Sequence, residues 1–522
     1  MISKHIAILC AAAAVGGLCF GPAIARAAEH DTRLVEAAAR GDLVGVRALL
    51  AHAPASQVNA AGVDGMTALH LAVRSDQRDM ANLLVHAGAD AAAKNRYGIT
   101  PLYLAAVNGS ADMIRMLLDA GADPNGVAPT GETALMTASR TGDPAAIRLL
   151  LERGARVDAR DAEFAQTALM LAVRENHPAA AKLLIDQGAT VNAQTRIGPT
   201  PEFRPPCKGT GCGSEGVGIN RGGLPDRGRR GEAVGGFTPL LYAARDGRVE
   251  EARLLVAAGA DVEIAEANQI RPLLMAVLNN QLEIARLLLA KGANPNADDF
   301  WGRSPLWAAV DYRNLDMNNR DQDSPIDNGV DRGPILDFVK TLIDAGADVN
   351  VRTREVPPSR RWLYSLGDVS WVDLTGQTPF LRAALSADTA AMRLLVAHGA
   401  NPNLPTLAGT TPLMAAAGVN WAVAQTFTES KDAQLNAVKL CLELGADINA
   451  TNSMGLTALI GAANRGSNDI IAFLAGHGAR LDVKDREGRT PTRWAEGVFL
   501  AAVGAERKPE TIALLEKLAA NR

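Results

Sequence analysis

Two cysteines, Cys207 and Cys212, lie in a stretch rich in glycine and arginine and could carry chemistry. Such a pair can form a local disulfide or supply half of the ligands of a zinc site. No histidine lies in residues 195–236 to complete a zinc site, and the chain has no C-x-x-C-H haem motif. We therefore expect a disulfide, with zinc as the less favoured alternative.

Two other segments match ligand-binding loops only in part. Residues 211–216 read G-C-G-S-E-G, but no strand is expected before them and no helix after them, so a nucleotide site is not expected. Asp321, Asp323 and Asp327 are spaced only loosely like a calcium loop, and a solvated acidic loop is the favoured interpretation. The chain also lacks G-x-S-x-G and H-E-x-x-H motifs, so we expect no catalysis, no metal site and no cofactor.

These segments interrupt a repeat that covers most of the 522 residues. Thr67, Thr100 and Thr133 are each followed by Pro or Ala and then Leu, at spacings of 33 residues. A Gly-Ala pair follows each motif about 21 residues later, as at Gly88. The motif threonine or its equivalent recurs at Thr67, Thr100, Thr133, Thr167, Thr238, Arg271, Ser304, Thr378, Thr411, Thr457 and Thr490.

One unit predicts two short helices. A threonine before proline is an N-cap followed by a favoured first helical residue. The Leu-Ala-Ala segment at 104–106 offers a narrow apolar face, and residues 114–118 repeat apolar side chains at helical spacing. Gly121 supplies the left-handed residue that ends the second helix. A unit of this size cannot bury its own apolar face, so neighbouring units must stack.

This pattern resembles the ankyrin repeat family over roughly residues 31–520. The resemblance implies an all-α repeat solenoid of about 12 helix-turn-helix units with β-turn fingers. A divergent unit from Arg33 forms the N-terminal cap, and a helix over about Pro509 to Ala519 closes the stack. The family's buried histidine is present only as His70, so apolar residues replace its hydrogen bonds elsewhere.

The longer units predict insertions that leave the stack intact. The expected organisation is a signal peptide (1–28), an N-terminal cap with repeats (29–194), a Gly/Arg/Cys-rich finger insertion (195–236), repeats (237–351) with an Asp-rich insertion (312–334), an aromatic finger insertion (352–376), and repeats (377–522) with an insertion at 418–434 and a C-terminal cap.

The N-terminus predicts export. Lys4 precedes an apolar stretch at 6–20 and small residues around Ala27, the pattern of a signal peptide cleaved after Ala27 or Ala28. A membrane anchor is less favoured, because this stretch spans only about 22 Å as a helix. The 42 arginines against 11 lysines are typical of a GC-rich bacterial genome. We therefore expect a periplasmic or secreted protein with no membrane insertion after cleavage.

The family resemblance implies a partner in the concave groove formed by finger tips and first helices. With 53 basic and 57 acidic residues, nucleic acid binding is not expected. Aromatic and arginine side chains dominate interface hot spots. The candidate binding residues are Arg96, Tyr97, Phe164, Phe300 and Trp301, the insertion residues Trp362, Tyr364 and Trp371, and an arginine row at Arg140, Arg174 and Arg245; Glu163, Asp311 and Tyr312 fall in the same groove. A solvated helix face is the alternative for the arginine row, and burial against the stack is the alternative for the three insertion aromatics.

The sequence thus favours a monomeric, non-catalytic scaffold that binds a partner protein outside the cytosol. Two alternatives remain. One is a secreted effector that binds a foreign protein. The other is an envelope enzyme or accessory subunit, with a ligand or metal site in the first and third insertions.

Overall fold

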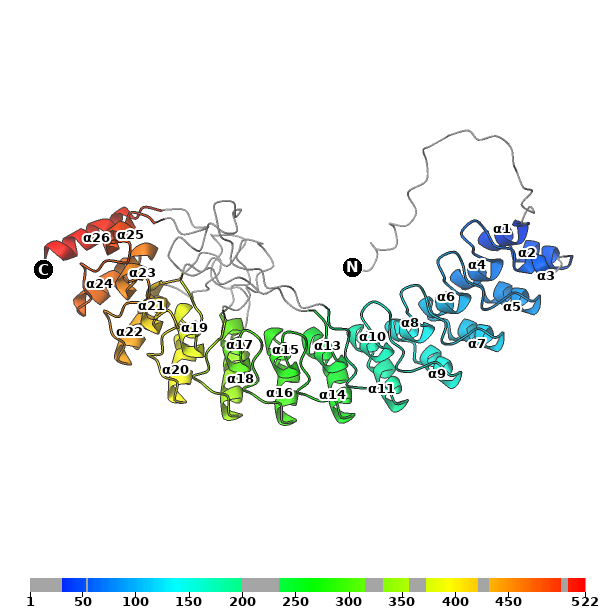
Figure 1. Ribbon diagram of the computed structural model, residues 1–522, viewed down its shortest axis with the longest axis horizontal. Helices are drawn as coiled ribbons and strands as arrows, with labels where there is room; N and C mark the ends of the chain where they lie inside the picture. The colour runs from blue at the N-terminus through cyan, green and yellow to red at the C-terminus, as the bar shows by residue number, and fades with distance from the viewer. Residues whose placement is uncertain are drawn as a thin grey trace, which may run out of the picture. The chain divides into compact units, whose positions relative to one another are not determined.

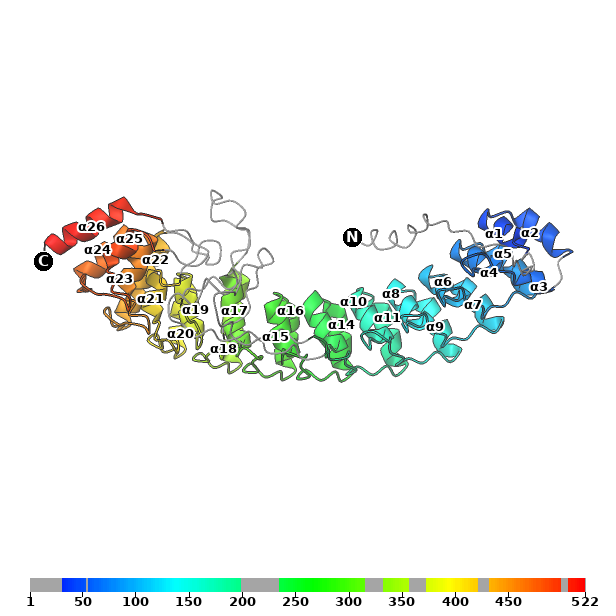
Figure 2. The same ribbon diagram turned by 45° about the horizontal axis from the view of Figure 1, so that its top comes forward.

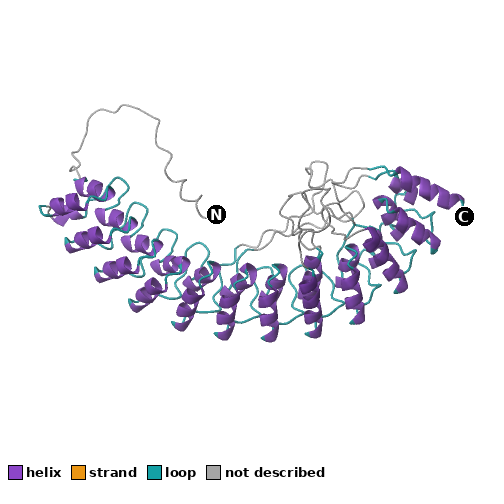
Figure 3. Ribbon diagram, turned by 180° about the vertical axis from the view of Figure 1, so that it is seen from behind, coloured by secondary structure: helices purple, strands orange, loops and turns teal. Residues whose placement is uncertain are grey.

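The computed structural model describes residues 31–52, 55–198, 234–314, 332–355, 372–420, 431–498 and 506–521. These residues form helices joined by turns, and they include no β-strand, only two isolated β-bridges (Figure 3). They divide into two compact units, which meet in the sequence between Asp123 and Pro124. The expected all-α repeat solenoid is confirmed for the described residues.

The first unit contains stacked helix pairs. Each first helix packs against its own second helix and against the next first helix, as α4 does with α5 and α6. The helices are α1 (Arg33–Ala39), α2 (Leu43–Leu50), α3 (Ala55–Val58), α4 (Ala68–Arg74), α5 (Arg78–His86), α6 (Pro101–Val107) and α7 (Ala111–Asp119). The divergent unit predicted from Arg33 forms α1 and α2, whereas α3 was not expected.

The second unit repeats the same arrangement over a longer stretch. Its first helices form one row and its second helices another, as Figures 1 and 2 show. The first helices are α8 (Ala134–Thr141), α10 (Ala168–Arg174), α13 (Pro239–Asp246), α15 (Pro272–Leu278), α17 (Pro305–Arg313), α19 (Pro379–Leu385), α21 (Pro412–Ala417), α23 (Ala458–Arg465) and α25 (Pro491–Ala495). The second helices are α9 (Pro144–Glu152), α11 (Pro178–Asp186), α14 (Val249–Ala257), α16 (Leu282–Ala290), α18 (Gly333–Asp344), α20 (Thr389–Ala397), α22 (Lys431–Glu443), α24 (Asn468–Gly476) and α26 (Pro509–Ala520).

The motif threonine starts the first helices as predicted. In α19, for example, the Thr378 Oγ1 accepts a hydrogen bond from the backbone N–H of Leu381 at 3.1 Å. Such a cap satisfies an N–H group that the helix itself leaves unpaired. Arg271, at the start of α15, makes no side-chain cap.

The motif glycine ends the second helices as predicted. After α20, Gly399 adopts a left-handed φ of 90°, which a side chain would strain. Its N–H donates to the Val396 carbonyl at 3.0 Å, and the N–H of Ala400 donates to the Leu395 carbonyl at 3.0 Å. These two bonds make a Schellman motif, which turns the chain out of the helix.

The core consists of the leucine and alanine faces of neighbouring helices. Leu413 and Leu459 are each 1 % exposed, and Ala308 is fully buried. Full burial of a leucine side chain contributes about 1.5–3 kcal/mol. Because these contacts lie between units, each repeat depends on its neighbours for stability.

Backbone hydrogen bonds join the tips of adjacent fingers. The N–H of Arg196, for example, donates to the Phe164 carbonyl at 2.7 Å. A Cβ at Gly131 would lie 2.4 Å from the Ala162 nitrogen, so glycine permits this close approach. Within the second unit the bonds run from Ala162 to Thr130, Arg196 to Phe164, Ala267 to Gly235, Phe300 to Asn268, Arg354 to Trp301, Leu407 to Thr375, Ser453 to Ala408 and Arg486 to Met454.

Side-chain amides join the other end of adjacent repeats. Asn125 donates to the Gly154 carbonyl at 2.9 Å and accepts from the Arg156 N–H at 2.8 Å. Asn296, Asn350 and Asn449 repeat this two-way bridge in the second unit, and Asn59 repeats it within the first. Each amide therefore fixes the start of the next finger relative to the previous one.

The boundaries of the insertions differ from the expected ones. Helix α17 extends through Arg313 and α18 begins at Gly333, so both ends of the insertion at 312–334 are helical. Helix α22 begins at Lys431, so the C-terminal end of the insertion at 418–434 is helical as well. At the base of the first insertion, the Gly198 N–H donates to the Val234 carbonyl at 2.8 Å. Helix α26 runs from Pro509 to Ala520, one residue beyond the predicted end at Ala519.

Several expectations fall outside the described residues. These are the signal peptide (1–28), Cys207 and Cys212, the three aspartates 321, 323 and 327, and Trp362, Tyr364 and Trp371. Among the helices that the structure describes, none has the length and apolar character needed to span a bilayer.

Candidate binding surface

The predicted arginine row lies at the ends of three successive first helices of the second unit. Arg140, Arg174 and Arg245 occupy the last turns of α8, α10 and α13. Each side chain reaches back to the residue before the motif threonine of its own repeat. Arg140 forms an ion pair with Glu132, Arg174 donates to the Gln166 Oε1 at 3.3 Å, and the Arg245 guanidinium lies 5.3 Å from the centre of the Phe237 ring.

Tyr242 connects two of these repeats. Its hydroxyl accepts a hydrogen bond from the Gln166 Nε2 at 2.9 Å. The guanidinium groups of Arg174 and Arg245 lie 5.5 and 5.0 Å from the centre of its ring. These distances allow cation–π attraction, so arginines from neighbouring repeats hold a 7 % exposed tyrosine between them.

The three arginines differ in how their charges are compensated. Arg245 makes two hydrogen bonds to Asp246, at 2.7 and 2.9 Å, and these bonds raise the pKa of its guanidinium. Arg140 is paired with Glu132. Arg174 contacts a neutral amide and an aromatic ring, and forms no ion pair within the described part of the chain.

The finger tips next to α10 expose apolar and basic side chains. Phe164 is 52 % exposed and Ile197, on the adjacent finger, is 58 % exposed. Arg196 directly precedes Ile197 in the sequence and is exposed, and its Nη1 donates a hydrogen bond to the Glu163 carbonyl at 3.4 Å. Arg160, on the side of the first finger, donates to the Gln194 carbonyl at 2.7 Å.

The expectation that Trp301 is an exposed anchor is wrong for this chain. Its side chain is 9 % exposed and carries the Arg303 guanidinium 5.1 Å from the ring centre. Phe300 is half-buried and packs edge-on against Trp301, with ring centres 5.5 Å apart. The spacing of the repeats predicted that Phe300 and Trp301 lie at a finger tip. It could not show that the Arg303 side chain covers the indole of Trp301.

Arg96 and Tyr97 occupy a finger tip of the first unit. Tyr97 is 55 % exposed, and the Arg96 N–H donates to the Asp64 carbonyl of the preceding finger at 3.0 Å. Both residues lie where the repeat predicts them, and the structure presents both side chains to solvent.

Sequence reasoning missed a buried ionic network between α17, α19 and α20. Asp311, expected in the groove, is 9 % exposed and accepts from the Arg382 Nε at 2.7 Å. Arg313 pairs with Asp388 at 2.7 and 3.3 Å. Asn314 is fully buried beside Asp388. One signal was present in the residues, since Arg382 occupies a position that is leucine in several other repeats, as at Leu71 and Leu171.

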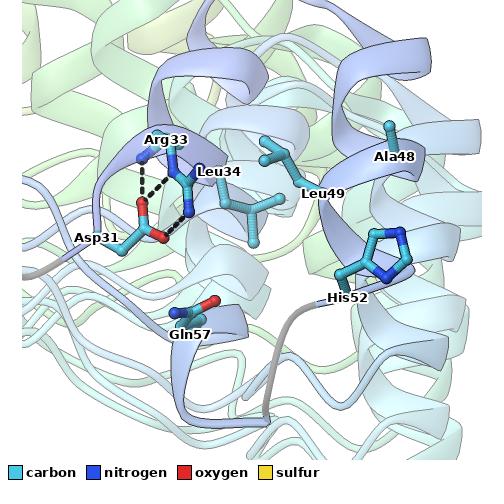
Figure 4. Close-up of a pocket in the computed structure, with 7 residues that line it drawn as sticks. All are labelled: Asp31, Arg33, Leu34, Ala48, Leu49, His52 and Gln57. Carbon is cyan, nitrogen blue, oxygen red and sulfur yellow. Dashed lines mark hydrogen bonds and ion pairs between the residues drawn. The ribbon is translucent and has the colours of Figure 1, made fainter.

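A pocket of about 180 Å³ opens beside α1 and α2 (Figure 4). It is lined in part by Asp31 and Arg33, whose hydrogen bond lowers the pKa of the Asp31 carboxyl to about 2. Both groups are held in an exposed ion pair. No group of three or more His, Cys, Asp or Glu side chains suited to a metal ion occurs in the described segments.

Comparison with known proteins agrees with this geometry. The family profile described as Ankyrin repeats (3 copies) matches residues 9–95, 34–127, 87–161, 125–195, 224–299 and 426–497, together well over half of the chain. A search of curated proteins found no match. With its paired helices, threonine-capped starts and glycine-terminated ends, the chain belongs to the ankyrin repeat family.

Proposed function

We propose that this protein is a non-catalytic scaffold, outside the cytosol, that captures a partner protein on the fingers and first helices of its second unit. Ankyrin repeats are protein–protein interaction modules. The observation that carries the proposal is the pair of adjacent finger tips at Phe164 and Ile197, which are 52 % and 58 % exposed beside the exposed Arg196. Aromatic and arginine side chains are among the residue types that contribute most to interface energy.

Rigidity supports this function. The finger-to-finger bonds, such as Arg196 to Phe164, and the amide bridges, such as Asn350 to Gly399, fix neighbouring repeats at both ends. A surface that is already ordered loses little conformational entropy when a partner binds.

The finger insertion contributes to capture in this proposal. Because the Gly198 N–H and the Val234 carbonyl are hydrogen bonded, the chain can be joined across 199–233 without moving the flanking fingers. The test is affinity purification of the full chain from an envelope fraction, followed by mass spectrometry of the proteins retained. A variant lacking 199–233 should remain folded and retain less of one specific protein. Absence of any specifically retained protein would contradict the proposal.

The location and the alternatives are tested in the same preparation. The scaffold predicts mature protein in the periplasm with residues 1–28 removed. Recovery chiefly from the culture medium would favour a secreted effector. Stoichiometric metal in the purified protein would favour the enzyme or accessory subunit with a site in the insertions.

A further inference from the structure

Three arginines near Phe164 are positioned by neutral oxygen atoms. Arg160 donates to the Gln194 carbonyl at 2.7 Å, Arg174 to the Gln166 Oε1 at 3.3 Å, and Arg196 to the Glu163 carbonyl at 3.4 Å. Within the described residues, none of the three forms an ion pair with a carboxylate. Their positive charges are therefore ordered but not compensated.

Backbone hydrogen bonds join the finger segments that carry these residues. The Asp161 N–H donates to the Gln166 carbonyl at 3.0 Å, which joins the two sides of the finger that carries Arg160. The Arg196 N–H donates to the Phe164 carbonyl at 2.7 Å, which joins this finger to the next. Arg174 lies in the last turn of α10, and its hydrogen bond to the Gln166 side chain connects it to the finger that carries Arg160.

Apolar side chains accompany the charges. Phe164 is 52 % and Ile197 is 58 % exposed at adjacent tips. The chain as a whole has more acidic than basic residues, 57 against 53, so this basic and apolar surface is a local exception. Guanidinium groups bind carboxylates through two parallel hydrogen bonds, and an exposed ring can cover an apolar side chain.

We propose that Arg160, Arg174, Arg196 and Phe164 bind an acidic segment of a partner protein, with its carboxylates on the arginines and an apolar side chain on Phe164. This inference rests on the proposed function and specifies the chemistry of its partner. Glu163 is the exception on this surface, because it is exposed and forms no ion pair in the described residues. An acidic ligand must therefore bind against its repulsion.

The test measures fluorescence anisotropy of a labelled peptide in which glutamates flank one phenylalanine, added to the full mature chain. The combined Arg160→Gln, Arg174→Gln and Arg196→Gln variant should bind at least about tenfold more weakly. The control combines Arg115→Gln, Arg148→Gln and Arg393→Gln, which remove the same charge from exposed positions on second helices. The control should bind within about twofold of the unmodified protein, because distant surface charges are screened by salt.

A second variant tests the sign of the interaction. Glu163→Gln removes a repelling carboxylate without touching an arginine, so it should strengthen peptide binding about two- to threefold. Circular dichroism of each variant confirms that the helices remain folded. A general loss of structure cannot raise affinity, so this variant separates recognition from stability.

Four outcomes would overturn the inference. The first is an equal loss of peptide affinity in the arginine and control variants, and the second is a single-stranded oligonucleotide that displaces the labelled peptide as well as unlabelled peptide does. The third is peptide binding that appears only after deletion of 199–233, and the fourth is weaker peptide binding by Glu163→Gln. The proposed function is judged separately by the retained protein. If the triple arginine variant still captures that protein as well as the unmodified chain does, the scaffold stands and the acidic-segment inference fails.

Discussion

The side chain of Asn350 binds the backbone on both sides of Ala400. Its Nδ2 donates to the Gly399 carbonyl at 3.2 Å, and its Oδ1 accepts from the N–H of Asn401 at 2.8 Å. Gly399 ends α20, while Asn350 belongs to the preceding finger. One amide therefore aligns two neighbouring repeats.

Replacement of this amide should loosen the boundary between the two repeats. We expect Asn350→Ala to lower the free energy of unfolding by about 1 kcal/mol, the usual contribution of a partly exposed hydrogen bond. Hydrogen exchange provides the measurement, because the Asn401 amide loses its acceptor and should exchange faster. Gln187→Ala, which removes an exposed amide that bridges nothing in the described chain, is the control. Unchanged protection at Asn401 would contradict the bridge.

Breaking the buried ion pair between Arg313 and Asp388 should lower the free energy of unfolding strongly. Asp388→Ala leaves Arg313 without its carboxylate in a buried environment and removes the cap of α20, so we expect a loss of about 3–5 kcal/mol in urea unfolding. Asp344→Ala breaks the exposed pair with Lys340 and should cost less than about 1 kcal/mol. Adding Arg313→Leu to Asp388→Ala should restore part of the loss. Equal losses for both aspartates would show that the network is solvated.

Glu251 should make the stability of the second unit depend on pH. The side chain is 1 % exposed, its Oε1 has no hydrogen-bond partner among the residues that the structure describes, and burial raises the pKa of its carboxyl above 4.5. The folded state therefore favours the protonated form. Stability contributed by that form is complete below about pH 4.5 and is lost as the pH rises through the raised pKa.

Substitution checks this direction. At pH 7, Glu251→Gln should stabilise the protein by on the order of 1 kcal/mol, and the gain should shrink as the pH falls towards 4.5. Glu250→Gln, one residue earlier and exposed, is the matched control and should have little effect. Thermal melts at several pH values measure both variants. A gain from Glu251→Gln that is the same at all pH values would contradict the assigned cause.

His70 should give the first unit the opposite pH dependence. It is fully buried, its Nδ1 accepts from the Thr67 N–H at 3.2 Å and its Nε2 contacts the Ile99 carbonyl at 3.0 Å. Burial lowers the pKa of the ring, so the folded state favours the neutral form. The stability from this neutral ring is present above pH 6.5 and is lost as the pH falls through the lowered pKa.

A histidine substitution isolates this effect. We expect His70→Gln to be less stable than the unmodified protein at pH 7, by about 1–3 kcal/mol for a buried group that loses a hydrogen bond. The difference should narrow on acidification towards pH 5. Urea unfolding followed by exchange of the α4 amides reports the first unit. A difference that stays constant with pH would contradict the role of the neutral ring.

The sequence was informative where chemistry is local. Thr378 caps α19 and Gly399 ends α20 because an N-cap hydroxyl and a left-handed residue act on their own backbone. Phe164 is exposed as the finger position implied. The number of repeats and their order follow from the same local signals.

Contacts between repeats were harder to predict. The Asn350 bridge and the Tyr242 contacts join residues that are far apart in the sequence and belong to different units of the repeat. Trp301 was expected to be exposed, but Arg303 lies over its ring. Asp311 and Arg313 were assigned to the groove or the insertion, although they face Arg382 and Asp388 on neighbouring helices. Such pairings depend on the stacking of repeats, which spacing along one unit does not specify.

The most direct test of the account places a photo-crosslinking amino acid at Phe164 and, in a separate variant, at Arg148 on the exposed side of α9. Both variants are expressed in the native host and irradiated, and adducts are identified by mass spectrometry. The account predicts one specific protein adduct from position 164 and none from position 148. An adduct from position 148 with none from position 164 would contradict the claim that fingers and first helices form the capture surface.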